Sequence, residues 1–346
     1  MVNVGEAKSL VFDGRHLQAL VRRGSSPFVL VTFNARGFRA NGKALWAEPV
    51  IRKFDLNAVG FVTKRPNWFP AEDLIPAMAA VQPFLSGFDE RIGYGYSQGG
   101  YAAIRASRPL GLTATITLSP QWSIDPRDII DERYNRFFDG AANGGMALTS
   151  ADSPERLLIL VDPHHQIDVA HLSRITQAIP DAEIVPLPSV NHDTIAVVAG
   201  SAPFSNMLEA VQTGGLLGAA LSPYRRSYAD RRGVMIGRLL ARDQGERAAR
   251  VLDGWSLDGR ERTKQLIRFL RHGAAQHVVH AAQRNARMQA GDPLALAAFA
   301  AILGRAGKSR RANAVAARVD AAGVGRKVRE LIRIARGETP AIVGEL

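Results

Sequence analysis

The stretch Arg91-Ile-Gly-Tyr-Gly-Tyr-Ser-Gln-Gly-Gly100 decides how the rest of the chain is interpreted. It predicts a short buried strand, a very tight turn with Ser97 at its apex, and a helix over about 98–107. Gly95 and Gly99 lie two residues on either side of Ser97, where side chains would collide with the neighbouring strand and helix. A helix that starts just after Ser97 directs free N–H groups at whatever binds there, and these groups stabilise negative charge.

Length and charge distribution predict two domains. The chain has 346 residues, of which 46% are apolar and 22% charged, as in ordinary globular proteins. Residues 1–213 carry 19 Lys and Arg against 21 Asp and Glu, whereas residues 214–346 carry 25 against 11. The whole basic excess of the +12 net charge therefore lies in the last third. We expect one domain over 1–213 and a basic one over 214–346.

Composition also excludes several classes of protein. No apolar run approaches the roughly 18 residues of a membrane span, so no transmembrane segment is predicted. The first seven residues, Met1 to Ala7, lack a basic region followed by an apolar one, and no secretory signal is visible. The chain has no cysteine, which excludes disulfides, thiolate metal sites and a cysteine nucleophile. Together these features favour a cytoplasmic protein.

The first domain alternates strand-like and helix-like segments. Such alternation predicts an α/β fold, a doubly wound and mostly parallel sheet covered on both faces. The long segment 120–153 is irregular and rich in Asp, Arg, Gly and aromatics, and we expect a lid or binding loop there. Besides the strand that leads to Ser97, the predicted strands are 8–13, 16–23, 28–33, 57–63, 114–119, 156–161 and 182–187. The predicted helices, besides the one after Ser97, are about 71–85, 169–179 and 194–211, the last interrupted near 202–203.

The region from about 221 onward has no strand-like run, and its apolar residues recur at helical spacing, which predicts an all-α domain. Asp292-Pro293 marks a helix start, with an N-cap side chain and a proline in the first turn. Gly307 and Gly323 are typical helix stops, so 292–307 and 308–323 form a predicted helical hairpin. The region resembles tetratricopeptide solenoids in style, without a clean repeat of about 34 residues. An appended helical bundle is the alternative.

Ser97 needs partners before its hydroxyl can act as a nucleophile: a base within hydrogen-bond reach, itself oriented by an acid. In a doubly wound sheet such partners lie in loops at the carboxyl ends of strands. Asp162 closes a buried strand, and His192 follows the next strand. Asp168 is an alternative acid, although it directly precedes a predicted helix and is well placed as an N-cap. We favour Asp162.

Over about residues 8–213 the chain resembles the α/β-hydrolases. The resemblance is carried by Gly95-Tyr-Ser-Gln-Gly99, by the strand that ends in Asp162, and by the passage from Ile179 to His192. It implies a serine hydrolase that acts on an ester (a carboxylesterase or deacylase) through a Ser97, His192 and Asp162 triad and an acyl-enzyme.

The resemblance also implies an oxyanion hole of two backbone N–H groups. One belongs to Gln98, and the other to Asn34 or Ala35 in the loop after Phe33. The sequence departs from the family there, because Phe33-Asn34 stands where a His-Gly pair is common.

The substrate is less closely indicated. Several residues beside the ends of sheet strands are candidates for binding it, where pockets form, although tryptophans can equally be core. They are Trp68, Phe69, Tyr96, Gln121 and Trp122. The passage Leu118 to Pro126 and the Ser-x-Gly-Gly-Tyr elbow also resemble bacterial hydrolase-like proteins associated with surface polysaccharide, a group distantly similar to the glycan-acetylating component of the accessory secretion system. An acylated glycan is therefore a candidate substrate. The alternatives are an acyltransferase for a surface polysaccharide, or a non-catalytic adaptor on a hydrolase scaffold.

Two further interpretations concern metals and partners. The cluster Asp162, His164, His165, Asp168 and His171 offers metal-ligand side chains, but adjacent histidines point in different directions and no established zinc spacing is matched. We predict neither a metal nor another cofactor. In the basic domain arginines are scattered around the helices without a recognition motif, so nucleic acid is not the predicted partner. Solvated helix faces, an acidic protein partner or an anionic membrane surface would each account for this charge.

Overall fold

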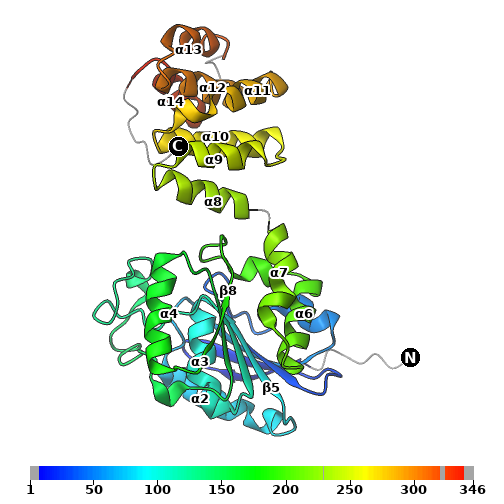
Figure 1. The fold of residues 1–346 in the computed structure, drawn as a ribbon. Coiled ribbons are helices and arrows are strands. Elements are labelled where there is room, and N and C mark those ends of the chain that lie inside the picture. The colour runs from blue at the N-terminus through cyan, green and yellow to red at the C-terminus, as the bar shows by residue number, and fades with distance from the viewer. Residues whose placement is uncertain (1–7, 229, 320–323, 339–346) are drawn as a thin grey trace. The chain divides into compact units, whose positions relative to one another are not determined.

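The computed structural model describes residues 8–228, 230–319 and 324–338 (Figure 1). The chain divides into two compact units, Met1–Tyr228 and Ala229–Leu346. The first unit extends beyond the expected boundary after residue 213, because helix α7 (Leu217–Ser227) belongs to it. Leu217 and Leu221 of α7 are fully buried in the core of the first unit, which ties the helix there.

The first unit is built on one eight-stranded sheet with the strand order β1-β2-β4-β3-β5-β6-β7-β8. β1 pairs with β2 and β2 with β4 in antiparallel fashion, and all other pairs are parallel. The predicted doubly wound, mostly parallel sheet is thus confirmed. The strands are β1 (Lys8–Asp13), β2 (Leu17–Arg22), β3 (Val29–Phe33), β4 (Asn57–Thr63), β5 (Arg91–Tyr96), β6 (Ala114–Leu118), β7 (Leu157–Val161) and β8 (Glu183–Pro186).

Helices cover both faces of the sheet, which is why its central strands are continuous apolar runs (Figure 1). In β3, Val29, Val31 and Phe33 face one layer, whereas Leu30 faces the other. The first layer consists of α2 (Ala71–Leu85), α3 (Gln98–Leu110) and α4 (Gln166–Ala178). The second consists of α1 (Glu48–Lys53), α5 (Ile195–Val198), α6 (Ser201–Gln212) and α7. Helix α1 is a feature that the sequence pattern did not predict.

The connection from β6 to β7 is irregular, as expected for residues 120–153. It contains two short 3₁₀ turns, η1 (Asn135–Phe137) and η2 (Ser150–Asp152). Hydrogen bonds fasten this 120–153 segment to the first unit: the Tyr101 hydroxyl donates to the Met146 carbonyl at 2.9 Å, and Arg105 pairs with Asp152 at 3.0 Å. It is therefore a packed part of the first unit.

The turn between β5 and α3 is sterically tight. Ser97 has φ 56° and ψ −119°, a left-handed φ that a side chain rarely adopts. A Cβ atom on Gly95 would lie 2.1 Å from the Gly99 carbonyl oxygen, and one on Gly99 would lie 2.2 Å from the Phe33 carbonyl oxygen. Only glycine fits at these two positions, which confirms the steric reason inferred from the sequence.

The second unit is helical throughout its described part. Asp292 caps α12 by accepting a hydrogen bond from the Leu294 N–H at 2.9 Å, and Gly307 follows the helix with φ 75°, both as predicted. The other expected stop, Gly323, lies outside the described residues. The resemblance to tetratricopeptide arrays stays a prediction. The elements are α8 (Arg231–Leu240), α9 (Gly245–Asp253), α10 (Gly259–Arg271), η3 (Ala275–Val278), α11 (Val279–Met288), α12 (Pro293–Arg305), α13 (Ser309–Ala316) and α14 (Arg326–Ala335).

Among the residues that the structure describes, no helix combines the length and the apolar character that crossing a membrane requires.

The tight turn leads to the first prediction. Gly99→Ala should destabilise the first unit by at least the ~1–3 kcal/mol typical of core overpacking, because the new Cβ would meet backbone that cannot move aside. Urea unfolding measures this loss. Gly87→Ala is the matched control, since its nearest neighbour there would be the Phe84 carbonyl oxygen at 3.8 Å. A loss for Gly99→Ala no larger than that of the control would contradict the prediction.

Candidate active site

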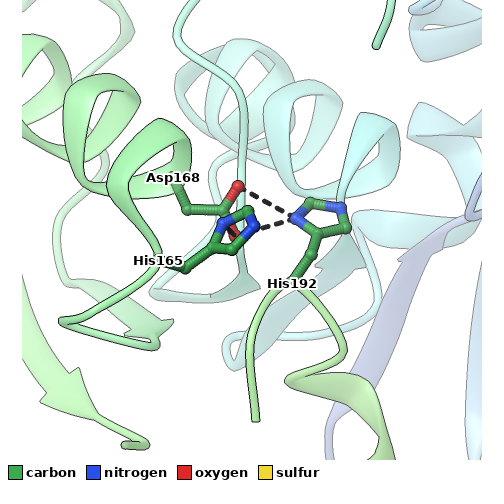
Figure 2. Close-up of side chains that lie close together, drawn as sticks. All are labelled: His165, Asp168 and His192. Carbon is green, nitrogen blue, oxygen red and sulfur yellow. Dashed lines mark hydrogen bonds and ion pairs between the residues drawn. The ribbon is translucent and has the colours of Figure 1, made fainter. Parts of the chain in front are cut away.

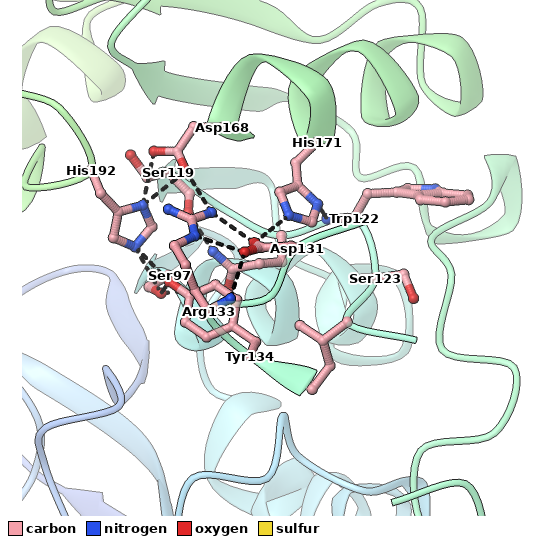
Figure 3. A network of polar contacts seen from close by, with 12 residues as sticks. Ser97, Ser119, Trp122, Ser123, Asp131, Arg133, Tyr134, Asp168, His171 and His192 are labelled. Carbon is pink, nitrogen blue, oxygen red and sulfur yellow. Dashed lines mark hydrogen bonds and ion pairs between the residues drawn. The ribbon is translucent and has the colours of Figure 1, made fainter. Parts of the chain in front are cut away.

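Ser97 lies at the carboxyl end of β5, in a cluster of polar side chains from separate parts of the first unit (Figure 3). Its Oγ is 3.1 Å from His192 Nε2, 3.4 Å from the Tyr134 hydroxyl and 3.4 Å from Gln121 Oε1. The Ser97 N–H donates to the Leu118 carbonyl at 2.9 Å, which fixes the turn against β6. Ser97 is only 4% exposed, so the 120–153 segment and the surrounding loops enclose its hydroxyl.

His192 follows β8 and bridges Ser97 and a carboxylate. Its Nδ1 lies 2.8 Å and 3.0 Å from the two carboxylate oxygens of Asp168 (Figure 2). Because an ionised carboxylate can only accept hydrogen bonds, Nδ1 carries the proton and Nε2 presents its lone pair to Ser97 Oγ. The arrangement therefore allows the Ser97 hydroxyl proton to pass to His192 Nε2.

Asp162, the acid favoured from the sequence, has a different position. It is fully buried at the end of β7, where Oδ1 accepts the His164 N–H at 3.0 Å. Its Oδ2 accepts the N–H groups of Val190 and Asn191 at 2.9 and 2.7 Å. The order of preference is thereby corrected: Asp168 is the carboxylate against His192, while Asp162 holds the backbone of the loop that carries His192.

The start of α4 explains why Asp168, and not Asp162, lies against His192. The helix starts at Gln166, earlier than the expected start near Val169, and its N-cap is His165. Asp168 thus lies in the first turn of the helix and is free to project toward His192 instead of capping.

The environment of Asp168 keeps it ionised. Its side chain is 1% exposed, and it lies 3.1 Å from Arg133 Nη2 and 3.1 Å from His165 Nδ1 in addition to the His192 contact. Burial opposes ionisation, but the contacts with His165 and His192 outweigh it and hold the pKa of Asp168 well below its ordinary range. At neutral pH this carboxylate is charged and orients His192.

A second ion pair supports Asp168 from the 120–153 segment (Figure 3). Arg133 donates from Nε and Nη2 to Asp131 at 2.8 and 2.7 Å. Asp131 also lies 3.0 Å from His171 Nε2, and the Trp122 N–H donates to His171 Nδ1 at 3.1 Å. Since Nδ1 accepts that bond, Nε2 carries the proton of a neutral His171 and donates it to Asp131. The network fixes the guanidinium that contacts Asp168.

Sequence reasoning missed Asp131, Arg133 and Tyr134 as site residues. The sequence indicated only the region in which they lie, because the irregular segment was expected to be a lid or binding loop. No motif singled out these three side chains.

The backbone N–H groups predicted to stabilise the oxyanion differ in their hydrogen bonding. Gln98 is the first residue of α3, so its N–H has no partner within the helix. The Asn34 N–H, in contrast, donates to the Phe61 carbonyl at 3.3 Å and continues the β3–β4 ladder. Of the two residues considered for the second donor, Ala35 is therefore the one that remains. The Asn34 side chain holds this loop, donating to the Ala35 and Phe38 carbonyls at 3.0 and 2.9 Å.

Two of the predicted substrate-binding residues, Tyr96 and Gln121, contact the Ser97–His192 pair, and a third, Trp68, contacts Gln121. The ring centre of Tyr96 is 5.4 Å from that of His192. Gln121 contacts Ser97 and accepts the indole N–H of Trp68 at 3.1 Å. These three side chains can therefore shape the space around the Ser97 hydroxyl.

The other two predicted substrate residues serve packing. Phe69 is buried, with its ring in an edge contact to Phe33 at 5.8 Å. Trp122 donates from its indole to the Leu148 carbonyl at 2.8 Å, which braces the 120–153 segment. Neither contact involves Ser97 or His192.

Within the described residues, the one group of three potential metal ligands is His165, Asp168 and His192, whose ligand atoms lie within 4.8 Å of one another (Figure 2). Two members belong to the Ser97–His192–Asp168 chain of contacts. His171, from the cluster considered in the sequence, is instead engaged with Asp131. Asp168 forms ion pairs with both histidines of this group.

Comparison with known proteins finds similarity at the level of the fold. No family model and no curated protein matches the chain. Among solved structures, the capsule O-acetyltransferase of Neisseria meningitidis serogroup A is 11% identical, with a TM-score of 0.43 over 58% of this chain and 93% of that one. An esterase of Pyrococcus furiosus is 14% identical (TM-score 0.40; 60% and 90% covered). Carboxyl esterase 2 of Tuber melanosporum is 13% identical (TM-score 0.41; 65% and 89% covered).

The buried carboxylates predict how stability depends on pH. Burial opposes ionisation of Asp131, but hydrogen bonds from His171 and Arg133 outweigh it and hold the pKa of Asp131 well below its ordinary range. Between that low pKa and the ordinary value of about 3.9, the unfolded chain binds more protons than the folded one. The contribution to stability is therefore present above pH about 4 and is lost on acidification.

Asp131→Asn should consequently flatten the fall in unfolding free energy below pH about 4, because the titrating carboxylate is gone. Urea unfolding at a series of pH values measures the slope. Asp139→Asn, the same change of charge at an exposed aspartate of the same segment, is the control and should keep the wild-type slope. Parallel profiles for Asp131→Asn and wild type would overturn this expectation.

Proposed function

We propose that the chain is a serine-dependent enzyme acting on ester bonds, with Ser97 as nucleophile, His192 as general base and Asp168 as the orienting acid. The observation that carries the proposal is the continuous chain of contacts from Ser97 Oγ to His192 Nε2 at 3.1 Å and from His192 Nδ1 to Asp168 at 2.8 Å. It has the geometry that activates a serine hydroxyl. A non-catalytic adaptor would not require these three side chains at hydrogen-bond distance.

In the first half-reaction Ser97 Oγ attacks the ester carbonyl carbon while its proton moves to His192 Nε2. The carbonyl oxygen becomes an oxyanion, which the Gln98 and Ala35 N–H groups are proposed to stabilise. When the intermediate collapses, the bond to the leaving alcohol breaks and that oxygen takes the proton from Nε2. Ser97 is then acylated, and His192 is neutral again.

In the second half-reaction a water molecule or another hydroxyl gives its proton to His192 Nε2 and attacks the acyl carbon. The bond to Ser97 Oγ breaks, and Oγ recovers the proton. Asp168 stabilises the imidazolium that forms in each half-reaction, because it stays ionised and contacts Nδ1. Water as acceptor gives a carboxylesterase, and a sugar hydroxyl gives an acyltransferase.

An acylated, hydroxyl-rich molecule such as a glycan is the proposed substrate class. The half-buried Tyr96 ring beside His192 and the Gln121 amide beside Ser97 combine an aromatic ring with a polar group, which suits a sugar ring. A polar cavity of about 640 Å³ lies in the same unit, next to the 120–153 segment. Its lining includes Arg65, Asn67, Arg136, Phe137 and Asn143.

Ser97→Ala tests the nucleophile. The variant should lose turnover of a panel of p-nitrophenyl esters and labelling by a fluorophosphonate probe, because Oγ is the atom that both reactions acylate or phosphonylate. Mass spectrometry of the labelled wild type should locate the adduct on Ser97. Labelling at a different serine, or at none, would refute the assignment.

The acid is tested by a matched pair of variants with the same change of charge. Asp168→Asn should lower kcat by about 10⁴-fold, because an amide against His192 Nδ1 favours the wrong tautomer. Asp162→Asn should act mainly on stability, since its carboxylate binds the backbone of Val190 and Asn191. Steady-state kinetics and thermal unfolding measured on both variants separate the two roles. A larger loss of kcat in Asp162→Asn would restore the acid preferred from the sequence.

A further inference from the structure

The Tyr134 hydroxyl has a position that the proposed reaction does not explain. It lies 3.1 Å from His192 Nε2 and 3.4 Å from Ser97 Oγ (Figure 3). Tyr134 is only 4% exposed, so this hydroxyl is enclosed with the two groups that it contacts.

That position coincides with the one required of the acceptor in the second half-reaction. The attacking oxygen must be within about 2.6–3.2 Å of the base, here His192 Nε2. It must also approach to roughly 3–3.5 Å from the acyl carbon, which is bonded to Ser97 Oγ. The Tyr134 hydroxyl meets the first distance and lies beside Oγ, so it fills the space that an attacking water would take.

Neighbouring side chains hold the phenol there. The Trp68 ring centre is 4.8 Å from that of Tyr134, and the Arg133 guanidinium lies 4.9 Å from the ring centre. Arg133 is itself fixed by Asp131 and Asp168. The hydroxyl is thus placed by packing on one side and by an ion-pair network on the other.

The phenol is a hydrogen-bond donor at neutral pH. Burial raises the pKa of Tyr134 above its ordinary value, and this outweighs the opposing effects of the Ser97 hydrogen bond and the Arg133 charge. His192 Nε2 has one lone pair, for which the Tyr134 and Ser97 hydroxyls compete. The Tyr134 hydroxyl therefore occupies the lone pair of His192 Nε2, as an attacking water would, but it stays attached to the protein and does not carry the acyl group away.

We propose that Tyr134 guards the acceptor position: it keeps water from the acyl-enzyme and gives way to a larger hydroxylated acceptor. This inference rests on the proposed function. Water gains no more from His192 than the phenol already provides, so it displaces the phenol poorly. A polyol or sugar gains further contacts that water does not make, against the half-buried Tyr96 ring, whose centre is 5.4 Å from that of His192. Tyr134 then favours acyl transfer over hydrolysis.

The experiment uses the full chain, acetylated from p-nitrophenyl acetate, and follows loss of the acetyl-Ser97 enzyme by intact mass. Tyr134→Phe keeps the ring on Trp68 and removes the hydroxyl, and hydrolysis of the acetyl-enzyme should become about fivefold faster, the equivalent of one ordinary hydrogen bond. With glycerol added, the ratio of glyceryl acetate to acetate should fall relative to wild type. Tyr101→Phe, which removes another buried hydroxyl bonded to the same segment, should change neither quantity.

Unchanged or slower hydrolysis in Tyr134→Phe would overturn the inference, as would a wild type that releases acetate alone in glycerol. Tyr134→Leu serves as a second variant if the phenylalanine form unfolds, with the same expected direction. Failure of the proposed function is recognised separately, because wild type would then carry no fluorophosphonate or acetyl adduct on Ser97.

Discussion

The candidate site depends on one buried carboxylate. Asp168 is almost completely removed from water, which by itself would favour its neutral form, and yet its charge is what orients His192. Three side chains from three places in the chain offset the cost of this burial by their contacts with Asp168: His192 after β8, His165 at the start of α4 and Arg133 in the 120–153 segment. Removing one of these partners leaves more of the cost of burying the charge uncompensated, so the neighbours depend on one another.

Through this dependence the 120–153 segment both covers Ser97 and helps to hold Asp168 in place. Arg133 reaches Asp168 only because Asp131 holds its guanidinium, and Asp131 is in turn held by His171 on α4. The next residue along the chain, Tyr134, contacts Ser97 and His192. Two adjacent side chains of an irregular segment thus touch all three members of the proposed triad. A segment without regular structure can hold such positions because ion pairs and ring contacts replace a backbone ladder.

The sequence predicted the parts of this site that local sterics and periodicity determine. The strand–turn–helix around Ser97 followed from two glycines that the backbone requires, and the sheet followed from apolar runs between helical segments. The choice between Asp162 and Asp168 could not be made in this way, because both follow β7 and precede His192. It depended on α4 starting at Gln166 and on which backbone N–H groups Asp162 meets. Arg133 and Tyr134 have no periodic signal at all, since tertiary contacts alone place them.

The same arrangement links access to the proposed acyl-enzyme with the orientation of His192, the proposed base. If the part of the segment that carries Arg133 and Tyr134 moves away, Ser97 becomes accessible, and Asp168 loses its contact with Arg133 at the same moment. An opening fluctuation that admits water therefore weakens the hold on the acid that supports His192. An acceptor that displaces only the phenol leaves Arg133 on Asp168 and keeps the base oriented. The proposed discrimination between water and a larger hydroxyl acceptor thus rests on two neighbouring residues with separate partners, Arg133 on Asp168 and Tyr134 on His192.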